Sequence, residues 1–401
     1  MSLLARFRAL PVLVRRLAWV SFFTDASSEM IYPLLPALLL SMGAGAQMLG
    51  AVEGIAESVS AFVKWWTGRA SDRHSQRKPF VLAGYGVATL VRPLLAFATT
   101  PFHVIAIRTV DRFGKGLRGA PRDAMVAQSV TPEVRGLAFG FHRMMDNAGA
   151  VLGPAIAFGL TRALGWPLRW VFGAAIAPGL CAMAILAFGV EEPRGKATPK
   201  GRDEERAPRP GLERPVRRYL GVVALFTLAS SADSFLILRL IDLGLAVSWT
   251  PVAWLTLNAT KSLTNVPGGH LSDRFGRKRV LAVAWGVYAA AYLAFPLTKS
   301  VAVTWLLMLG YGTYYGLAEG GEKAIVADLA PADQRGRAFG SFQAVTGIMV
   351  LPANVLFGAL YARDPAWAFV EAGALSLVSA VLLVALVPTR PLRPPSAGRG
   401  A

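Results

Sequence analysis

The sequence is poor in cysteine, histidine and charge, and each shortage excludes a class of protein. Its one cysteine, Cys181, cannot form an intrachain disulfide, which excludes a disulfide scaffold. The four histidines are scattered and no HExxH or GxSxG pattern occurs, so we expect no enzyme, no metal site and no cofactor. Charged residues make up 16% of the chain, against roughly 25% in a soluble domain, which argues against a soluble fold.

Long apolar runs take the place of that missing charge. Hydrophobic residues make up 54% of the chain, and apolar runs of about 20 residues predict membrane-spanning helices. We predict twelve spans, at residues 17–40, 47–68, 79–99, 102–126, 136–161, 167–190, 219–243, 250–270, 279–298, 302–327, 336–361 and 366–388. The lipid bilayer is therefore an expected partner of this chain.

The formal net charge of +18 sets the orientation of the spans and does not indicate a nucleic-acid-binding protein. Lys and Arg are concentrated in alternate short loops, whereas SMGAGAQ at 41–47 and TTPFH at 99–103 contain neither. Basic loops stay in the cytoplasm. We expect a multi-pass protein of a bacterial-type inner (plasma) membrane, with a retained first helix and both termini cytoplasmic.

An internal repeat divides the chain into two halves. GRASDRHSQRK from Gly68 matches GHLSDRFGRKR from Gly269, and RGLAFGF from Arg135 matches RGRAFGS from Arg335. We expect an N-terminal half at 1–190, a Pro-rich charged cytoplasmic linker at 191–218, a C-terminal half at 219–390 and a cytoplasmic tail at 391–401. Each half holds six spans.

The repeated loop resembles the signature of the major facilitator superfamily, which is Gly, three residues, Asp, a basic residue, one residue, Gly and further basic residues. The second copy has Gly269, Asp273, Arg274, Gly276 and Arg277; the first has Gly68, Asp72, Arg73 and Arg77, with Ser75 at the second Gly. The resemblance implies an all-α integral membrane fold of twelve helices in two parallel six-helix halves. It further implies a monomer that works by alternating access, with this motif as a conformational switch.

Two shorter patterns bear on the mode of transport. Gly140, Gly149, Gly153 and Pro154 resemble a motif of the antiporter branch, although close packing of helices on small residues also accounts for them. Arg112 resembles the family arginine that acts in proton coupling, with Lys115 where the family has Gln. These resemblances imply a proton as a partner.

Ionisable residues inside the spans are costly and mark function. We expect proton-coupling residues in the first half, namely Asp25, Glu29, Glu53, Glu57, Arg112 and Asp146. Asp25 and Glu29 share one helix face, as do Glu53 and Glu57. The alternative is permanent ion pairs, for example Arg112 with Asp146.

Candidate substrate contacts lie mainly in the second half, which is poorer in acids. They are Lys115, Asn258, Lys261, Tyr311, Tyr315 and Glu319. Lys261 has no acid one turn away in its own helix. It faces an anionic substrate, or it pairs with Asp233 or Glu319, and the sequence leaves both open.

The sequence thus favours a proton-coupled transporter that moves a small organic molecule, by export in antiport with protons. A symporter or exchanger of an organic anion is the second reading, favoured by the basic residues Arg112, Lys115, Arg118 and Lys261. A translocator of lipids or other amphiphiles is the third.

Overall fold

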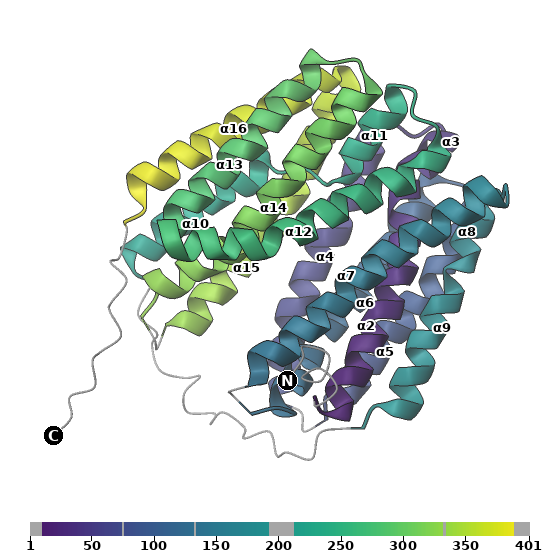
Figure 1. Ribbon diagram of the computed structural model, residues 1–401, viewed down its shortest axis with the longest axis horizontal. Helices are drawn as coiled ribbons and strands as arrows, with labels where there is room; N and C mark the ends of the chain where they lie inside the picture. The colour runs from purple at the N-terminus through teal and green to yellow at the C-terminus, as the bar shows by residue number, and fades with distance from the viewer. Residues whose placement is uncertain (1–9, 74–75, 132–133, 192–211, 332–333, 389–401) are drawn as a thin grey trace.

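The computed structural model describes residues 10–73, 76–131, 134–191, 212–331 and 334–388, and every regular element in them is helical. The N-terminal half contains α2 (Val12–Ile31), η1 (Tyr32–Leu34), α3 (Leu35–Ser41), α4 (Ala46–Arg73), α5 (Lys78–Val91), η2 (Arg92–Phe97), α6 (Pro101–Gln128), α7 (Arg135–Phe158), η4 (Gly159–Ala163), α8 (Leu168–Ala174), α9 (Ile176–Ala184) and η5 (Ile185–Gly189). The C-terminal half contains α10 (Arg214–Ala229), α11 (Ser234–Asp242), η7 (Val247–Trp249), α12 (Thr250–Phe275), α13 (Arg277–Ala294), η8 (Phe295–Leu297), α14 (Val301–Leu329), α15 (Arg335–Arg363) and α16 (Pro365–Leu386). Figure 1 shows these helices gathered into two bundles.

The twelve predicted spans are confirmed, with several helices longer than the apolar stretches. α4 and α12 run five residues past the predicted ends at 68 and 270, and α10 begins at Arg214, inside the segment expected to be linker. The helices extend through polar residues beyond the apolar stretches, and α12 ends before Gly276, whose φ of +92° lies outside the helical region. The predicted tail and most of the predicted linker lie outside the described residues.

Seven of the described spans are long and apolar enough to cross a membrane by length and composition. The other five, formed by α2 with α3, α4, α6, α7 and α12, carry ionisable side chains within their length. Since an ionisable group in a span must find a partner or water, these five spans are the first candidates for the functional site, together with the charged residues Arg92 and Asp233 of the other seven.

The first span of each half is interrupted. In the N-terminal half, Pro33 and Pro36 lack the N–H that a continuous helix needs, and η1 separates α2 from α3. In the C-terminal half, α10 ends at Ala229 and α11 begins at Ser234. Tyr288 donates a hydrogen bond of 3.1 Å to the carbonyl oxygen of Ala229, so part of the freed backbone has a side-chain partner.

Glycines let helices within one half approach closely. A Cβ at Gly149 would overlap the carbonyl oxygen of Phe22, and one at Gly153 would overlap that of Ala26. These contacts hold α7 against α2. Gly140, which begins the same sequence pattern, has no neighbour that a Cβ would meet.

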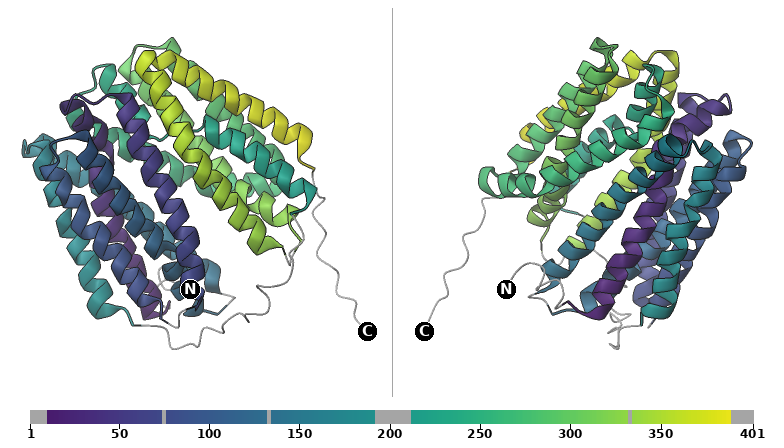
Figure 2. Two further views of the ribbon diagram at one scale, coloured as in Figure 1. Left: turned by 180° about the vertical axis from the view of Figure 1, so that it is seen from behind. Right: turned by 45° about the vertical axis from the view of Figure 1, so that its right-hand side comes forward.

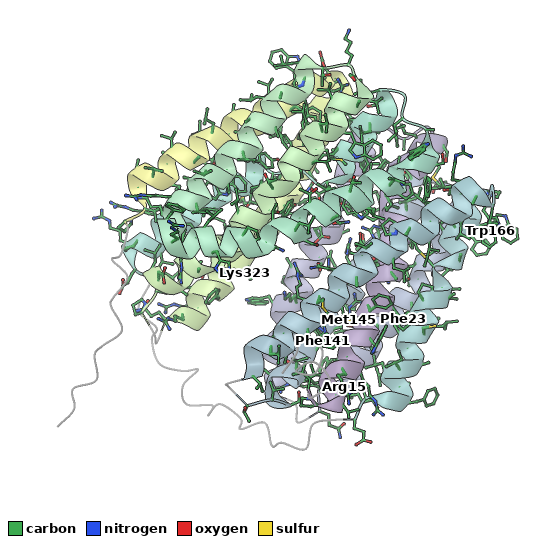
Figure 3. The ribbon with its side chains drawn as sticks, in the orientation of Figure 1. Arg15, Phe23, Phe141, Met145, Trp166 and Lys323 are labelled. Atoms are coloured by element: carbon green, nitrogen blue, oxygen red, sulfur yellow. The ribbon has the colours of Figure 1, made fainter. Side chains whose placement is uncertain are left out.

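The two halves pack on each other mainly through α4 with α15 and α7 with α12. Ser58 on α4 donates a hydrogen bond of 2.9 Å to the carbonyl oxygen of Gly347 on α15. The bundles meet at the end that holds the loops 42–45 and 243–246, here called the closed end. They diverge toward the end where α9 finishes and α10 begins, here called the linker end (Figure 2). Trp166 lies toward the closed end and Arg15 toward the linker end (Figure 3).

Candidate functional site

α4 and α6 carry two matched pairs of opposite charge. Glu53 and Glu57 lie one turn apart on α4, and Arg108 and Arg112 lie one turn apart on α6. Glu57 and Arg112 form an ion pair with an Oε1–Nε distance of 3.1 Å. Glu53 and Arg108 lie 3.8 Å apart and are both almost fully buried. The structure thus brings three of the predicted proton-coupling residues onto one helix interface.

A second buried pair, Arg92 with Asp111, extends this cluster and is absent from the sequence-based prediction. Arg92 donates from Nε to Asp111 over 2.8 Å and from Nη1 to the carbonyl oxygen of Thr24 over 3.0 Å. Arg108 reaches the second oxygen of Asp111 over 3.2 Å. Arg92 is the one charged residue in the predicted span 79–99, so the sequence did contain a signal for it.

Asp146 belongs to a separate network that joins α7, α2 and α6. Its carboxylate lies 3.4 Å from Nδ1 of His142, and Nε2 of His142 lies 3.1 Å from the hydroxyl of Ser21. Arg122 donates to the same hydroxyl over 3.1 Å. The suggested pairing of Arg112 with Asp146 is therefore wrong, because Arg112 pairs with Glu57 across the contact of α6 with α4, whereas Asp146 lies against His142 one turn away on α7.

Asp25 differs from these acids. Its side chain on α2 is partly buried, and it has no hydrogen bond or ion pair with any described residue. The charged groups that act on it electrostatically are Asp146, Arg118, Glu29 and Lys115. Lys115 is exposed and likewise has no ion pair within the described parts of the chain.

A compact polar cluster in the C-terminal half is centred on Asp233. Its carboxylate forms an ion pair with Lys261, which is one of the pairings that the sequence left open for that lysine; a contact of Lys261 with substrate stays a prediction. The hydroxyl of Tyr311 donates to Asp233 Oδ1 over 2.5 Å, and that of Tyr315 over 3.5 Å. The Lys261 ammonium lies 3.8 Å from the ring centroid of Tyr315 and 5.5 Å from that of Trp254.

Trp254 connects this cluster to the N-terminal half. Its indole Nε1 donates a hydrogen bond of 2.6 Å to Oε2 of Glu29 on α2. Its ring packs on Tyr32 with centroids 4.6 Å apart. The hydroxyl of Tyr32 in turn donates to Glu53 over 3.4 Å. A chain of polar and aromatic contacts therefore crosses from one half to the other, and sequence reasoning did not find its central residue.

The predicted substrate contacts Asn258 and Glu319 make no described interaction with the Asp233 cluster. Asn258 lies one turn before Lys261 on α12, and its buried Nδ2 makes no hydrogen bond with the described groups. The side chain of Glu319 lies outside the described residues. Among the residues that were described, no group of three His, Cys, Asp or Glu side chains is placed to hold a metal ion.

The repeated loop motif is described best in its second copy. Gly276 makes the turn between α12 and α13 with its positive φ. Gly269 has no neighbour that a Cβ would meet, whereas the adjacent Gly268 packs closely on Gly316. Arg277 donates to the carboxylate of Asp328 on α14 over 2.7 Å. Arg274 lies over the ring of Phe275.

In the first copy, Gly68 approaches Ala120 on α6 and Arg77 is buried. The side chains of Asp72, Arg73 and, in the second copy, Asp273 lie outside the described residues. The interactions of those three residues therefore stay predictions.

Comparison with known proteins assigns the chain to a family. The sequence model of the Major Facilitator Superfamily matches residues 17–258 and 242–401. An uncharacterized MFS-type transporter of Methanocaldococcus jannaschii is 32% identical over 374 residues, covering 92% of this chain and 93% of that protein. The multi-drug resistance efflux pump PmrA of Streptococcus pneumoniae is 26% identical over 81% of this chain and 83% of its own length.

Solved structures share the fold at low identity. A POT family transporter in complex with 5-aminolevulinic acid superposes with a TM-score of 0.78 at 11% identity, over 95% of this chain and 99% of that one. A D-xylose–proton symporter superposes with a TM-score of 0.73 at 15% identity, over 94% and 97%.

Proposed function

Because this chain belongs to the Major Facilitator Superfamily of membrane transporters, we propose that it exports a small organic molecule in exchange for protons, by alternating access. Export is supported by its similarity to PmrA, a multi-drug resistance efflux pump. We place both termini in the cytoplasm of a cell with a bacterial-type inner membrane, since the basic loops lie at the linker end. The halves diverge at that end, so the state described here opens toward the cytoplasm (Figure 1).

The observation that carries the proton assignment is the contrast between Asp25 and the other membrane acids. Glu53, Glu57 and Asp111 lie against arginines, and Asp146 lies against His142. Asp25 has no such partner among the described residues. An arginine that lies against a carboxylate favours its ionised form, whereas a carboxylate without such a partner changes its protonation more readily when its surroundings change. Asp25 is therefore the proposed proton carrier.

Glu29 and Arg112 take supporting roles in this proposal. Glu29 accepts from Trp254 of the other half and so links protonation on α2 to the contact between halves. Arg112 neutralises Glu57 on α4. In this proposal Glu53 and Asp146 are fixed members of structural pairs and do not carry protons.

Transport of an organic anion is the second candidate, and Lys115 favours it. Its ammonium group is exposed beside Arg112 and Asp25 and has no ion pair with the described residues. An anion that bound Lys115 would come close to Asp25 and would favour its protonated form. That coupling would make substrate and proton travel together.

The two candidates are separated in vesicles that contain the purified protein and a trapped pH dye. Substrate added outside raises the luminal pH if protons leave in exchange, and lowers it if protons enter with the substrate. Asp25→Asn is expected to abolish the change, whereas Asp364→Asn, an acid that begins α16 outside the bilayer, leaves it intact. Substrate-driven proton movement that persists in Asp25→Asn would overturn the assignment.

A further inference from the structure

Asp233 stands at a helix N-terminus, but its carboxylate does not cap that helix. Asp233 is the N-cap of α11, yet its side chain makes no capping hydrogen bond to that helix. It accepts instead from Tyr311 and Tyr315 on α14 and pairs with Lys261 on α12. An acid at the break of a membrane helix, held by three donors from other helices, forms a fixed negative site between elements.

That site also has aromatic walls. Tyr315 and Trp254 present ring faces to the position held by the Lys261 ammonium, at 3.8 and 5.5 Å from their centroids. A carboxylate combined with aromatic faces is the arrangement by which proteins bind alkylammonium groups. In this structure the ammonium group beside Asp233 and the two rings is that of Lys261.

The Lys261 ammonium is the movable member of the cluster. Asp233 is fixed by Tyr311 and by its place in the backbone break, whereas Lys261 carries its charge on a flexible four-carbon stem. The side chains of Asp233 and Lys261 keep 10% and 16% of their surface exposed, so the pair is largely buried and a ligand reaches Asp233 by taking the place of the Lys261 ammonium.

We infer that Asp233, Tyr311, Tyr315 and Trp254 form a binding site for the ammonium group of an organic cation, and that Lys261 fills this site as a tethered cation until the ligand displaces it. The inference rests on the proposed function only in treating the ligand as cargo. The site is filled here by a primary ammonium group, so a primary alkylammonium is the ligand that matches it best. Trp254 also binds Glu29, so a ligand in this site contacts a side chain that joins the two halves.

Isothermal titration of the full chain in detergent tests the inference without any proton gradient, so that its failure is distinct from a failure of proton coupling. The probe is phenethylammonium, with phenethyl alcohol and phenylpropionate as its uncharged and anionic counterparts. Lys261→Met removes the tethered cation, and Lys261→Gln removes the charge while keeping a donor for Asp233. The matched control is Lys323→Met, which removes an exposed lysine toward the linker end of α14 (Figure 3).

We expect phenethylammonium to bind about tenfold tighter in Lys261→Met and Lys261→Gln than in the wild type, because the competing cation is gone. The affinity for phenethylammonium is expected to fall again when Asp233→Asn is added to either Lys261 variant. The affinity of Lys323→Met for phenethylammonium should equal that of the wild type. The affinity for phenethyl alcohol should be the same in all variants. Unchanged affinity in both Lys261 variants overturns the inference. Phenylpropionate binding to the wild type that is lost in both variants also overturns it, and makes Lys261 an anion receptor.

Discussion

The indole N–H of Trp254 on α12 donates a 2.6 Å hydrogen bond to the carboxylate of Glu29 on α2, and this bond joins the two halves of the molecule. The Trp254 ring also packs on Tyr32 at the break of the first span. A hydrogen bond to a charged group contributes about 1.5–3 kcal/mol, which is enough to bias an equilibrium between two transporter conformations.

Trp254→Phe keeps the aromatic packing and deletes the hydrogen bond. We expect the population of molecules that are open at the closed end to rise about tenfold. Spin labels at Thr99 and Lys299, in a Cys181→Ser background, report the separation of the halves there by double electron–electron resonance. Trp367→Phe, an exposed tryptophan on α16, is the control. An unchanged distance distribution would show that the bond has no influence on the conformation.

Gly149 and Gly140 offer a matched pair for the packing of α7. Gly149→Ala places a methyl group against the backbone of Phe22, where nothing flexible can yield, and we expect a loss of about 1–3 kcal/mol. Gly140→Ala meets no neighbour and removes a helix-weakening glycine. The measurement is the apparent melting temperature in detergent, which should fall for the first variant alone. Equal melting temperatures would mean that the glycine pattern does not act through packing.

The buried pair of Arg92 and Asp111 is expected to be structural. Arg92→Met or Asp111→Leu alone leaves a buried charge without its nearest partner, at a cost of about 3–5 kcal/mol. The double variant removes both charges and should regain much of that loss. Thermal unfolding of the three variants measures the coupling, and additive losses would contradict it.

The ion pair of Arg277 with Asp328 links the second copy of the loop motif to α14. Both side chains are partly exposed, at 29% and 40%, so the pair is worth about 1 kcal/mol or less. Asp328→Asn should therefore slow transport only several-fold. Gln128→Asn, at the equivalent repeat position of the N-terminal half, is the control. Loss of all transport in Asp328→Asn would show a role beyond this contact.

The sequence predicted the spans well because hydropathy is a local property. The twelve spans and the two halves follow from apolar runs and a repeat, which need no knowledge of how helices face each other. Even the i, i+4 placement of Glu53 and Glu57 is local. These features lie on single helices, so one chain suffices to find them.

The ion-pair partners of the charged residues are harder to predict from the sequence, because they depend on which helices pack against each other. Arg112 was paired with Asp146 as an example, yet α4 brings Glu57 against it. The role of Trp254 depends on the approach of the two halves, which no local pattern encodes. Arg92 was visible as a lone charge in an apolar span, but its importance emerged only with Asp111 beside it.

The most direct test of the proposed mechanism counts protons when substrate binds. The purified protein in weakly buffered detergent is titrated with a compound that drives proton movement in the vesicle assay, and pH is followed with a dye. Exchange through Asp25 predicts the release of about one proton for each molecule bound, no release in Asp25→Asn, and unchanged release in Asp364→Asn. Full release in Asp25→Asn while the compound still binds would contradict Asp25 as the proton carrier.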